Sequence, residues 1–218
     1  MSLSGRLSVF VLGWSLLAPA SPVFAQALSE SFDVVVPPGW TAINNSVPMG
    51  TTTVFQGNPV VFPAQSGAPN SYAGMNFNAT TGNNTISVWL ITPVRTPLQN
   101  GTVSFFTRTV AGSIFPDRLQ FYVSTNGSCN PGTGPTSVGD FATLLVDINP
   151  TLALGGYPVA WTQFLLTVSG VPGGASGCFA FRYFVTNGGP DGSHSNYIGI
   201  DTFDYGVVPV ELMGFSVE

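Results

Sequence analysis

The chain has 218 residues, of which only 7% are charged, and ten acids against five arginines and no lysine give a formal net charge of −5. Soluble proteins ordinarily carry roughly 25% charged residues, and without a basic patch to neutralise phosphates this composition argues against a nucleic-acid partner. The content of Phe, Val, Leu and Ile argues against intrinsic disorder. The length suits one domain, and a surface built from Gly, Pro, Ser, Thr and Asn is typical of an all-β extracellular module.

Residues 1–25 are predicted to be a signal peptide. Arg6 supplies a short positive region, residues 7–17 are mostly apolar, and small residues offer cleavage before Gln26 or before Leu28. An N-terminal anchor helix is the alternative, but the apolar run is short beside the roughly 20 residues that span a bilayer. We therefore expect an exported chain, secreted or held at the cell surface, with no membrane span in its mature form.

Alternation of apolar and polar residues, interrupted by Gly, Pro and Asn, predicts about ten short strands and no substantial helix after the signal peptide. Residues 37–70 are rich in loops. The pattern indicates an all-β fold, a β-sandwich formed by a single domain over residues 28–218. The strands are expected at residues 30–36, 51–55, 72–76, 85–91, 102–108, 119–124, 141–147, 161–168, 178–186, 197–205 and 207–217.

The stretch from Cys178 to Tyr205 organises the rest of the chain. Its first strand has large apolar residues in both alternating sets, which predicts a strand covered on both faces. The connection 187–194 is dense in Gly, Asn, Pro and Asp, so we expect it to join the two strands as a central β-hairpin. Asp201 lies in the middle of the second, otherwise apolar strand, where a carboxylate needs a partner.

Several segments of the chain match one known family in the same order. They are SESFD with PPGW, TGNNTISVWLITP, LQNGTVSFFTRTV with FPDRLQFYVSTNG, DFATLLVDINP, GGYPVAWTQFLLTVSG and FRYFVTNGGPDGSHSNYIGIDT. The chain thereby resembles the choice-of-anchor J domain family, which is similar to the cleaved-adhesin and MAM-like jelly-roll domains of secreted bacterial proteins. The resemblance implies a jelly-roll sandwich. It favours an exported, non-catalytic adhesion or binding module whose partner is a surface protein or a glycan.

The resemblance also implies a cofactor. Related adhesin domains bind calcium near their first and last strands, which places a structural calcium site at Glu30, Asp33 and Asp201. Calcium takes six to eight oxygen ligands at about 2.3–2.6 Å. The alternative is that Asp201 accepts hydrogen bonds from backbone amides or pairs with Arg108 or Arg182.

Cys129 and Cys178 are the only cysteines of the chain. In an exported protein an even number of cysteines predicts a disulfide. This disulfide would tie the loop-rich segment 126–139 to the start of the central strand. In the chain-entropy model, closing such a loop stabilises the folded state by roughly 4 kcal/mol. The alternative is two unpaired buried thiols.

The sequence contains few of the residues and motifs that catalysis needs. His194 is the only histidine, and its place in a turn indicates a solvated loop residue rather than the base of a Ser-His-acid arrangement. No Gly-x-Ser-x-Gly elbow is present. Glycoside hydrolysis needs two carboxylates, but no paired motif includes the glutamates Glu30, Glu211 and Glu218. We predict that the chain is not an enzyme, with a jelly-roll glycosidase as a distant alternative.

The remaining charged residues favour structural roles. Asp117 is followed by Arg118, which predicts a local ion pair or a turn acid. Arg108 and Arg182 stand inside strands beside phenylalanines, where a guanidinium must be paired or stacked on a ring. A structural ion pair is the favoured interpretation, and ligand binding is the alternative.

Three tryptophans, Trp40, Trp89 and Trp161, would support a carbohydrate-binding module if they lay together on one surface. Each more often packs in a core or covers the edge of a sheet. A carbohydrate-binding module is accordingly the second functional hypothesis.

Overall fold

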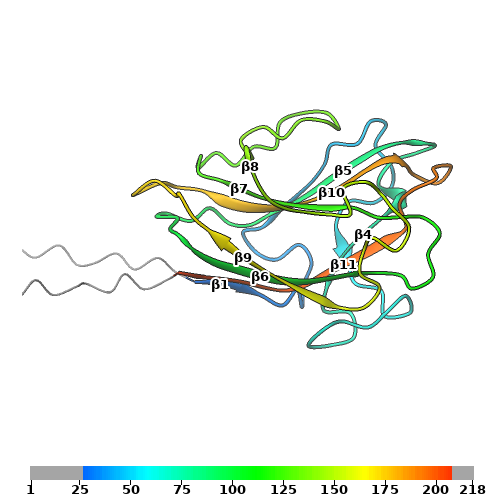
Figure 1. Ribbon diagram of the computed structural model, residues 1–218, viewed down its shortest axis with the longest axis horizontal. Helices are drawn as coiled ribbons and strands as arrows, with labels where there is room; N and C mark the ends of the chain where they lie inside the picture. The colour runs from blue at the N-terminus through cyan, green and yellow to red at the C-terminus, as the bar shows by residue number, and fades with distance from the viewer. Residues whose placement is uncertain (1–26, 208–218) are drawn as a thin grey trace, which may run out of the picture.

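The computed structural model describes residues 27–207 as two antiparallel sheets packed face to face (Figure 1). The six-stranded sheet has the spatial order β3 (Phe55–Gln56), β4 (Ala73–Asn76), β11 (Tyr197–Val207), β6 (Gly101–Thr109) and β9 (Thr162–Val168), with β1 (Leu28–Glu30) paired to β11. The five-stranded sheet has the order β2 (Thr41–Asn44), β5 (Asn84–Ile91), β10 (Cys178–Gly188), β7 (Leu119–Ser124) and β8 (Thr143–Ile148).

The predicted β-sandwich is confirmed, and within residues 27–207 the only helical segment is the short 3-10 turn η1 (Phe77–Ala79). The start of the domain differs from the prediction. The expected strand 30–36 shares only Glu30 with β1, because the strand ends before Phe32, which adopts a φ of 54° and turns its ring inward against Trp40. The alternation pattern did not predict β2. The predicted signal peptide, residues 1–25, and most of the expected strand 207–217 lie outside the described residues.

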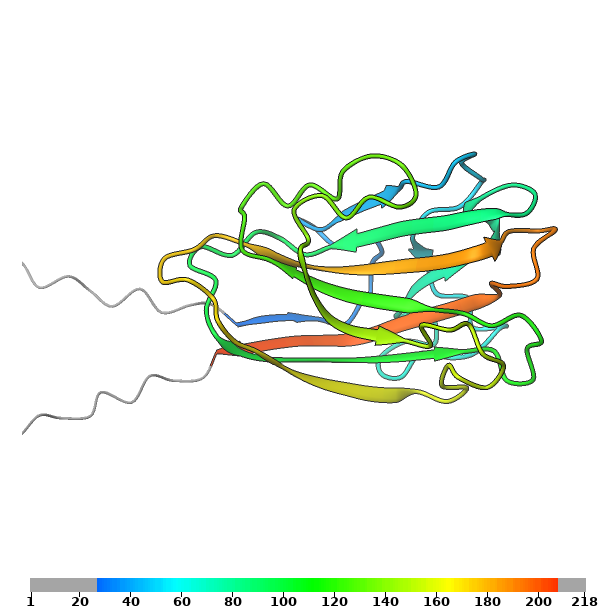
Figure 2. The same ribbon diagram turned by 45° about the horizontal axis from the view of Figure 1, so that its top comes forward.

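The predicted hairpin of β10 and β11 is wrong, because the two strands belong to different sheets. β10 is central in the five-stranded sheet, β11 is central in the six-stranded sheet, and residues 189–196 cross between them at one end of the sandwich (Figure 2). Each strand has an inward apolar face, so Phe181 and Phe203 meet in the core at 5.9 Å between ring centroids. Alternation reports which residues share a face, and it does not distinguish pairing within a sheet from packing between sheets.

Phenylalanine rings form the centre of the core between the sheets. Phe121 lies 4.6 Å from Phe181, and Phe105 lies 4.9 Å from Phe181, between ring centroids. Each of these side chains is fully buried, and full burial of one such ring contributes about 1.5–3 kcal/mol. The aromatic contacts join β6 of one sheet to β7 and β10 of the other.

A bulge in β11 changes which residues face this core. The register against β6 shifts between Asp201 and Asp204, and Thr202 has a φ of 50°. An inserted residue reverses the alternation, so Phe203 turns into the core although simple alternation places it on the side of Asp201. Asp201 is left on the outer face of the sheet, under a loop.

Long loops cover the outer faces of both sheets. Residues 57–72 lie over the six-stranded sheet, where Phe62 and Tyr72 pack with Tyr197 of β11. Residues 126–142 lie over the five-stranded sheet, where Phe141 packs on Trp89 with ring centroids 5.3 Å apart. The predicted burial of β10 on both faces is confirmed, because one face meets the core and the other meets this second loop.

The two ends of the sandwich differ. Leu28 pairs with Tyr205, so the described chain begins and ends at one end. The turns 110–118 and 189–196 lie at the opposite end, called the loop end below (Figure 2). Among residues 27–207, no helix is long and apolar enough to span a bilayer.

Candidate ligand-binding cleft

Asp201 is fully buried and is held by hydrogen bonds rather than by an ion pair. Its Oδ2 accepts from the backbone N–H groups of Gln65 at 2.8 Å and Ser66 at 3.2 Å, and its Oδ1 accepts from the N–H of Thr202 at 2.7 Å. Burial raises the pKa of this carboxyl, and the three amide hydrogen bonds oppose the rise. Asp201 therefore anchors the loop 57–72 to the bulge of β11.

The other two acids of the expected calcium site have separate partners. Asp33 Oδ1 accepts from the Ser71 hydroxyl at 2.7 Å, and Glu30 Oε1 accepts from the N–H of Phe32 at 2.8 Å. Within the described residues, no three His, Cys, Asp or Glu side chains are grouped to hold a metal ion. Donors already point at the oxygens of Asp201, so these three acids do not fit a shared cation well. The calcium site stays a prediction.

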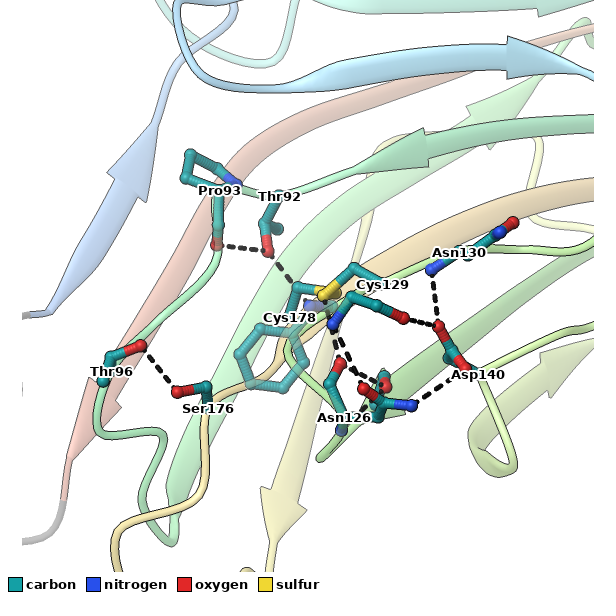
Figure 3. Close-up of a disulfide and its surroundings, with 12 residues drawn as sticks. Thr92, Pro93, Thr96, Asn126, Cys129, Asn130, Asp140, Ser176 and Cys178 are labelled. Atoms are coloured by element: carbon teal, nitrogen blue, oxygen red, sulfur yellow. Dashed lines mark hydrogen bonds between the residues drawn. A yellow bond between two sulfur atoms is a disulfide. The ribbon is translucent and has the colours of Figure 1, made fainter.

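Cys129 and Cys178 form the expected disulfide, which joins the loop 126–142 to the first residue of β10 (Figure 3). The loop is further fixed at Asp140, whose carboxylate accepts from the N–H of Asn130 at 2.9 Å and from Nδ2 of Asn126 at 3.0 Å. Hydrogen bonds from Ser128 and Asn130 lower the pKa of the Asp140 carboxyl. The segment 126–142 is therefore an ordered cover for the outer face of the sheet.

The three tryptophans do not form a common platform. Trp40 is 7% exposed in the core, and Trp89 is fully buried beneath the loop 126–142. Trp161 lies on the outer face of the other sheet and donates its Nε1–H to the carbonyl of Pro63 at 2.9 Å. Packing, the interpretation favoured from the sequence, is their role here.

The prediction of structural ion pairs at Arg108 and Arg182 is wrong. Arg182 is 2% exposed, donates to the carbonyl of Pro135 at 2.5 Å, and lies 3.9 Å from the centroid of Phe184. Arg108 donates to the carbonyl of Val159 at 2.7 Å and stacks on a ring of the loop 57–72. Both guanidinium groups use carbonyl oxygens and aromatic faces instead of acids.

Asp117 was expected to be a turn acid or to form a local ion pair with Arg118, and the ion pair is wrong. Arg118, just before β7, pairs instead with Asp147 of β8 at 2.6 Å. Asp117 points between the sheets and is fully buried. Its carboxyl oxygens lie within hydrogen-bond distance of the hydroxyls of Thr109 and Tyr183, each at 2.5 Å. Burial raises its pKa, and hydrogen bonds oppose this rise.

A cleft lies at the loop end, and Asp117 accepts a hydrogen bond from the N–H of Asn196, one of the residues that line it. The cleft has a volume of about 190 Å³ and is lined by Phe77, Phe115, Gly189, Pro190, Gly192, Ser195 and Asn196. Two aromatic side chains from different connections thus line one small cavity together with an amide, a hydroxyl and backbone of a glycine-rich turn. The volume is below the roughly 300 Å³ at which pockets for drug-sized ligands begin, so the cleft suits one small unit of a larger ligand.

Three segments that are distant in the sequence are fixed to one another beneath the cleft. Asp117 Oδ1 accepts from the N–H of Asn196 at 2.7 Å, and the carbonyl of Asn196 accepts from the N–H of Phe77 at 3.0 Å. The N–H of Ser195 donates to the carbonyl of Pro116 at 2.9 Å. The residues on both sides of the cleft are therefore positioned by the backbone before any ligand arrives, which lowers the entropic cost of binding.

The glycine-rich turn needs its glycines to form this wall. Gly189 has a φ of 97°, and a Cβ atom there would lie 2.3 Å from the carbonyl oxygen of Gly82. His194 belongs to the same turn, and its Nδ1 atom lies 2.8 Å from the carbonyl oxygen of Thr186. It does not line the cleft, which agrees with its prediction as a loop histidine.

Two other cavities have different chemistry. One of about 170 Å³ is lined by residues of the segments 109–117 and 153–159, among them the ionisable Asp117 and Tyr157. The other, of about 370 Å³, lies beside the disulfide and is lined by Pro93, Cys129, Asn130 and their neighbours. Its walls come mainly from aliphatic side chains, prolines and threonines, with no aromatic ring. The cleft between Phe77 and Phe115 is therefore the better candidate site.

Sequence reasoning did not find this cleft. Phe77 and Phe115 stand in unrelated segments, and Asn196 and Asp117 are 79 positions apart. The glycine-rich turn 187–194 was the one part of the cleft that the sequence pattern indicated. It was interpreted as the turn of a hairpin and not as the wall of a cleft.

No family model and no curated protein matches the chain, but solved structures do. The K1 cleaved adhesin domain of Lys-gingipain from Porphyromonas gingivalis W83 superposes with a TM-score of 0.57 at 20% identity, covering 84% of this chain and 99% of that one. The fold is similar to that of the cleaved adhesin domains. The K2 cleaved adhesin domain of the same protein gives a TM-score of 0.55 at 17% identity, covering 84% and 98%.

A further match is a structure described as a carbohydrate-binding module of the β-sandwich superfamily. Its TM-score is 0.51 at 15% identity, and the match covers 81% of this chain and 60% of that one. At these identities the likenesses show a common fold, and ligands do not transfer with a fold.

Proposed function

We propose that the chain is an exported, non-catalytic binding module that acts outside the cell or at its surface and takes its ligand in the cleft between Phe77 and Phe115. The observation that carries the proposal is the rigid, two-sided aromatic cleft at the loop end. The likeness to cleaved adhesin domains supports it, as do the disulfide and the signal-peptide pattern, both of which suit an oxidising compartment. Membership of the choice-of-anchor J family is part of the same proposal.

Carbohydrate binding is the second candidate, and a specific feature favours it. The apolar face of a sugar ring packs on an aromatic side chain, while amide and backbone groups read its hydroxyls. Phe77 and Phe115 provide the aromatic surfaces, and Asn196 and Ser195 provide polar groups beside them. The likeness to a carbohydrate-binding module agrees with this candidate.

Absence of catalysis is supported by the lining of the cleft. None of its seven residues has an ionisable side chain, so neither a proton donor nor a nucleophilic carboxylate faces a ligand there. Asp117, the acid of the supporting network, is fully buried and bonded to Asn196, Thr109 and Tyr183.

A binding screen paired with a turnover assay tests the proposal. The mature chain is applied to a glycan array and to extracted cell-surface proteins, and is incubated separately with pooled polysaccharides. We expect a ligand from one of the two panels, binding that Phe115→Ala weakens, and no release of reducing ends. Release of reducing ends that requires the cleft would contradict a non-catalytic module.

A further inference from the structure

Among the edge strands of the described residues, β9 has an unusual combination of length and neutrality. β1, β2 and β3 have two to four residues, and β8 carries Asp147 and a bulge in its pairing with β7. β9 has seven residues, TQFLLTV, without a charge, a proline or a register shift against β6. Proteins usually blunt free edges with such devices, because unpaired N–H and C=O groups invite another strand.

The exposed side of β9 is apolar at its centre. Leu165 is 71% exposed in the middle of the strand, and its neighbours Phe164 and Leu166 are only partly buried although they pack toward the core. On the adjoining edge of the other sheet, Leu144 of β8 is 44% exposed. The open side of the sandwich between β8 and β9 therefore presents apolar side chains beside unpaired backbone groups.

The sequence of β9 is nearly symmetric about Leu165. Antiparallel pairing of two copies of β9 centred on this residue places Leu165 opposite itself. Phe164 then lies opposite Leu166, and Gln163 opposite Thr167. Apolar residues meet apolar residues, and an amide meets a hydroxyl, which is the self-complementarity that a two-fold interface requires.

Charge also favours a second copy at this edge. The chain carries a net charge of −5, which opposes self-association in general. On β8 and β9, however, the only charged side chain is Asp147, and Arg118 neutralises it at 2.6 Å. Two copies can therefore approach through this side without bringing unpaired acids together.

We propose that the protein forms a homodimer in which the β9 strands of two copies pair antiparallel about Leu165, joining the two six-stranded sheets into one continuous sheet. The β9 end nearest the loop end is Thr162, which pairs with Thr107 of β6. Antiparallel pairing consequently directs the two loop ends away from each other. Such a dimer presents one cleft at each end and suits the bridging of two surfaces.

Sedimentation velocity over a wide range of concentration tests the association. We expect a monomer–dimer equilibrium in the wild-type protein. Leu165→Arg places like charges opposite each other on the two-fold axis and should weaken the dimer at least about tenfold. Ile114→Arg is the matched control, because Ile114 is also 71% exposed but lies in the 110–118 turn. The control should associate as the wild type does.

Cross-linking tests the register independently of affinity. Cross-strand Cα atoms lie about 4.5–5.5 Å apart, within the about 4.4–6.8 Å that a disulfide spans. Because Cys129 and Cys178 are bonded to each other, Leu165→Cys introduces one free thiol per chain. It should oxidise to a covalent dimer with a mapped 165–165 bond, and Ile114→Cys should not. A wild type that stays monomeric, equal effects of the two arginine variants, or equal cross-linking of the two cysteine variants would overturn the proposal.

Discussion

The Oδ2 atom of Asp117 lies 2.5 Å from the hydroxyl oxygen of Thr109, and that hydroxyl also lies 2.9 Å from the carbonyl oxygen of Tyr197. A hydroxyl has one proton and cannot donate to both acceptors. A protonated Asp117 satisfies the arrangement, since its carboxyl donates to Thr109 and Thr109 donates to Tyr197. The fully buried carboxyl has no basic side chain among its hydrogen-bond partners, so the neutral form is the less costly one to bury.

Stability should therefore depend on pH through Asp117. Because burial raises its folded-state pKa above the ordinary value of 3.8, the folded state holds a proton that the unfolded state has released between the two pKa values. The stabilisation is full below the unfolded pKa and is lost as pH rises through the folded pKa. Urea unfolding of the wild type should show this loss. Asp117→Asn, which mimics the neutral acid, should reduce it, and an unchanged slope in this variant would assign the dependence to another group.

Removal of the acceptor should cost far more than neutralisation. Asp117→Ala leaves the donors of Tyr183 and Asn196 without their partner in a buried site, at about 1–3 kcal/mol for each unsatisfied group. We expect this variant to lose several times the stability lost by Asp117→Asn in the same urea titration. Similar losses in the two variants would show that the hydrogen bonds of Asp117 contribute little.

The disulfide should stabilise the chain by closing a long loop. Cys129 and Cys178 are 49 positions apart, for which the chain-entropy model gives about 4 kcal/mol. The double variant Cys129→Ala, Cys178→Ala should unfold at correspondingly lower urea concentration, and reduction of the wild type should give a similar change. Non-reducing peptide mapping of the protein purified without reductant should find the two cysteines linked. Two titratable thiols per denatured chain would contradict the bond.

Chelation separates the two roles considered for Asp201. A calcium ion shared with Glu30 and Asp33 would raise the thermal midpoint by several degrees, and Asp201→Asn would abolish the difference. Hydrogen bonds from Gln65 and Ser66 need no ion. These contacts favour equal midpoints with calcium and with excess chelator, and no calcium by elemental analysis. A calcium-dependent midpoint that requires Asp201 would instead establish the structural ion.

Strands were predictable where apolar alternation is long and turns flank it, as at β5, β6, β7 and β9. The bulge at Asp201 was not, because a positive φ at Thr202 depends on the loop 57–72 that covers it. The disulfide followed from counting cysteines, whereas the pairing of Arg118 with Asp147 depends on the strand order of β7 and β8.

The candidate cleft depends on contacts that local sequence patterns do not contain. Phe77 and Phe115 become neighbours only after β10 and β11 are assigned to different sheets, which places the turn 189–196 across the end of the sandwich. Period-two alternation is the same for both assignments. The cleft at the loop end could therefore not be predicted before the sheet order was known.

Calorimetric titration of Phe115→Ala with the ligand that the binding screen identifies is the most direct test of the proposed site. Phe115 is 40% exposed and lines the cleft, while its neighbour Ile114 is 71% exposed, does not line it, and serves as the control. Loss of the Phe115 ring should weaken binding at least about tenfold, or about 1.4 kcal/mol, with the thermal midpoint unchanged. Ile114→Ala should bind as the wild type does. Unchanged affinity in Phe115→Ala would show that the ligand binds elsewhere and would contradict the proposed cleft.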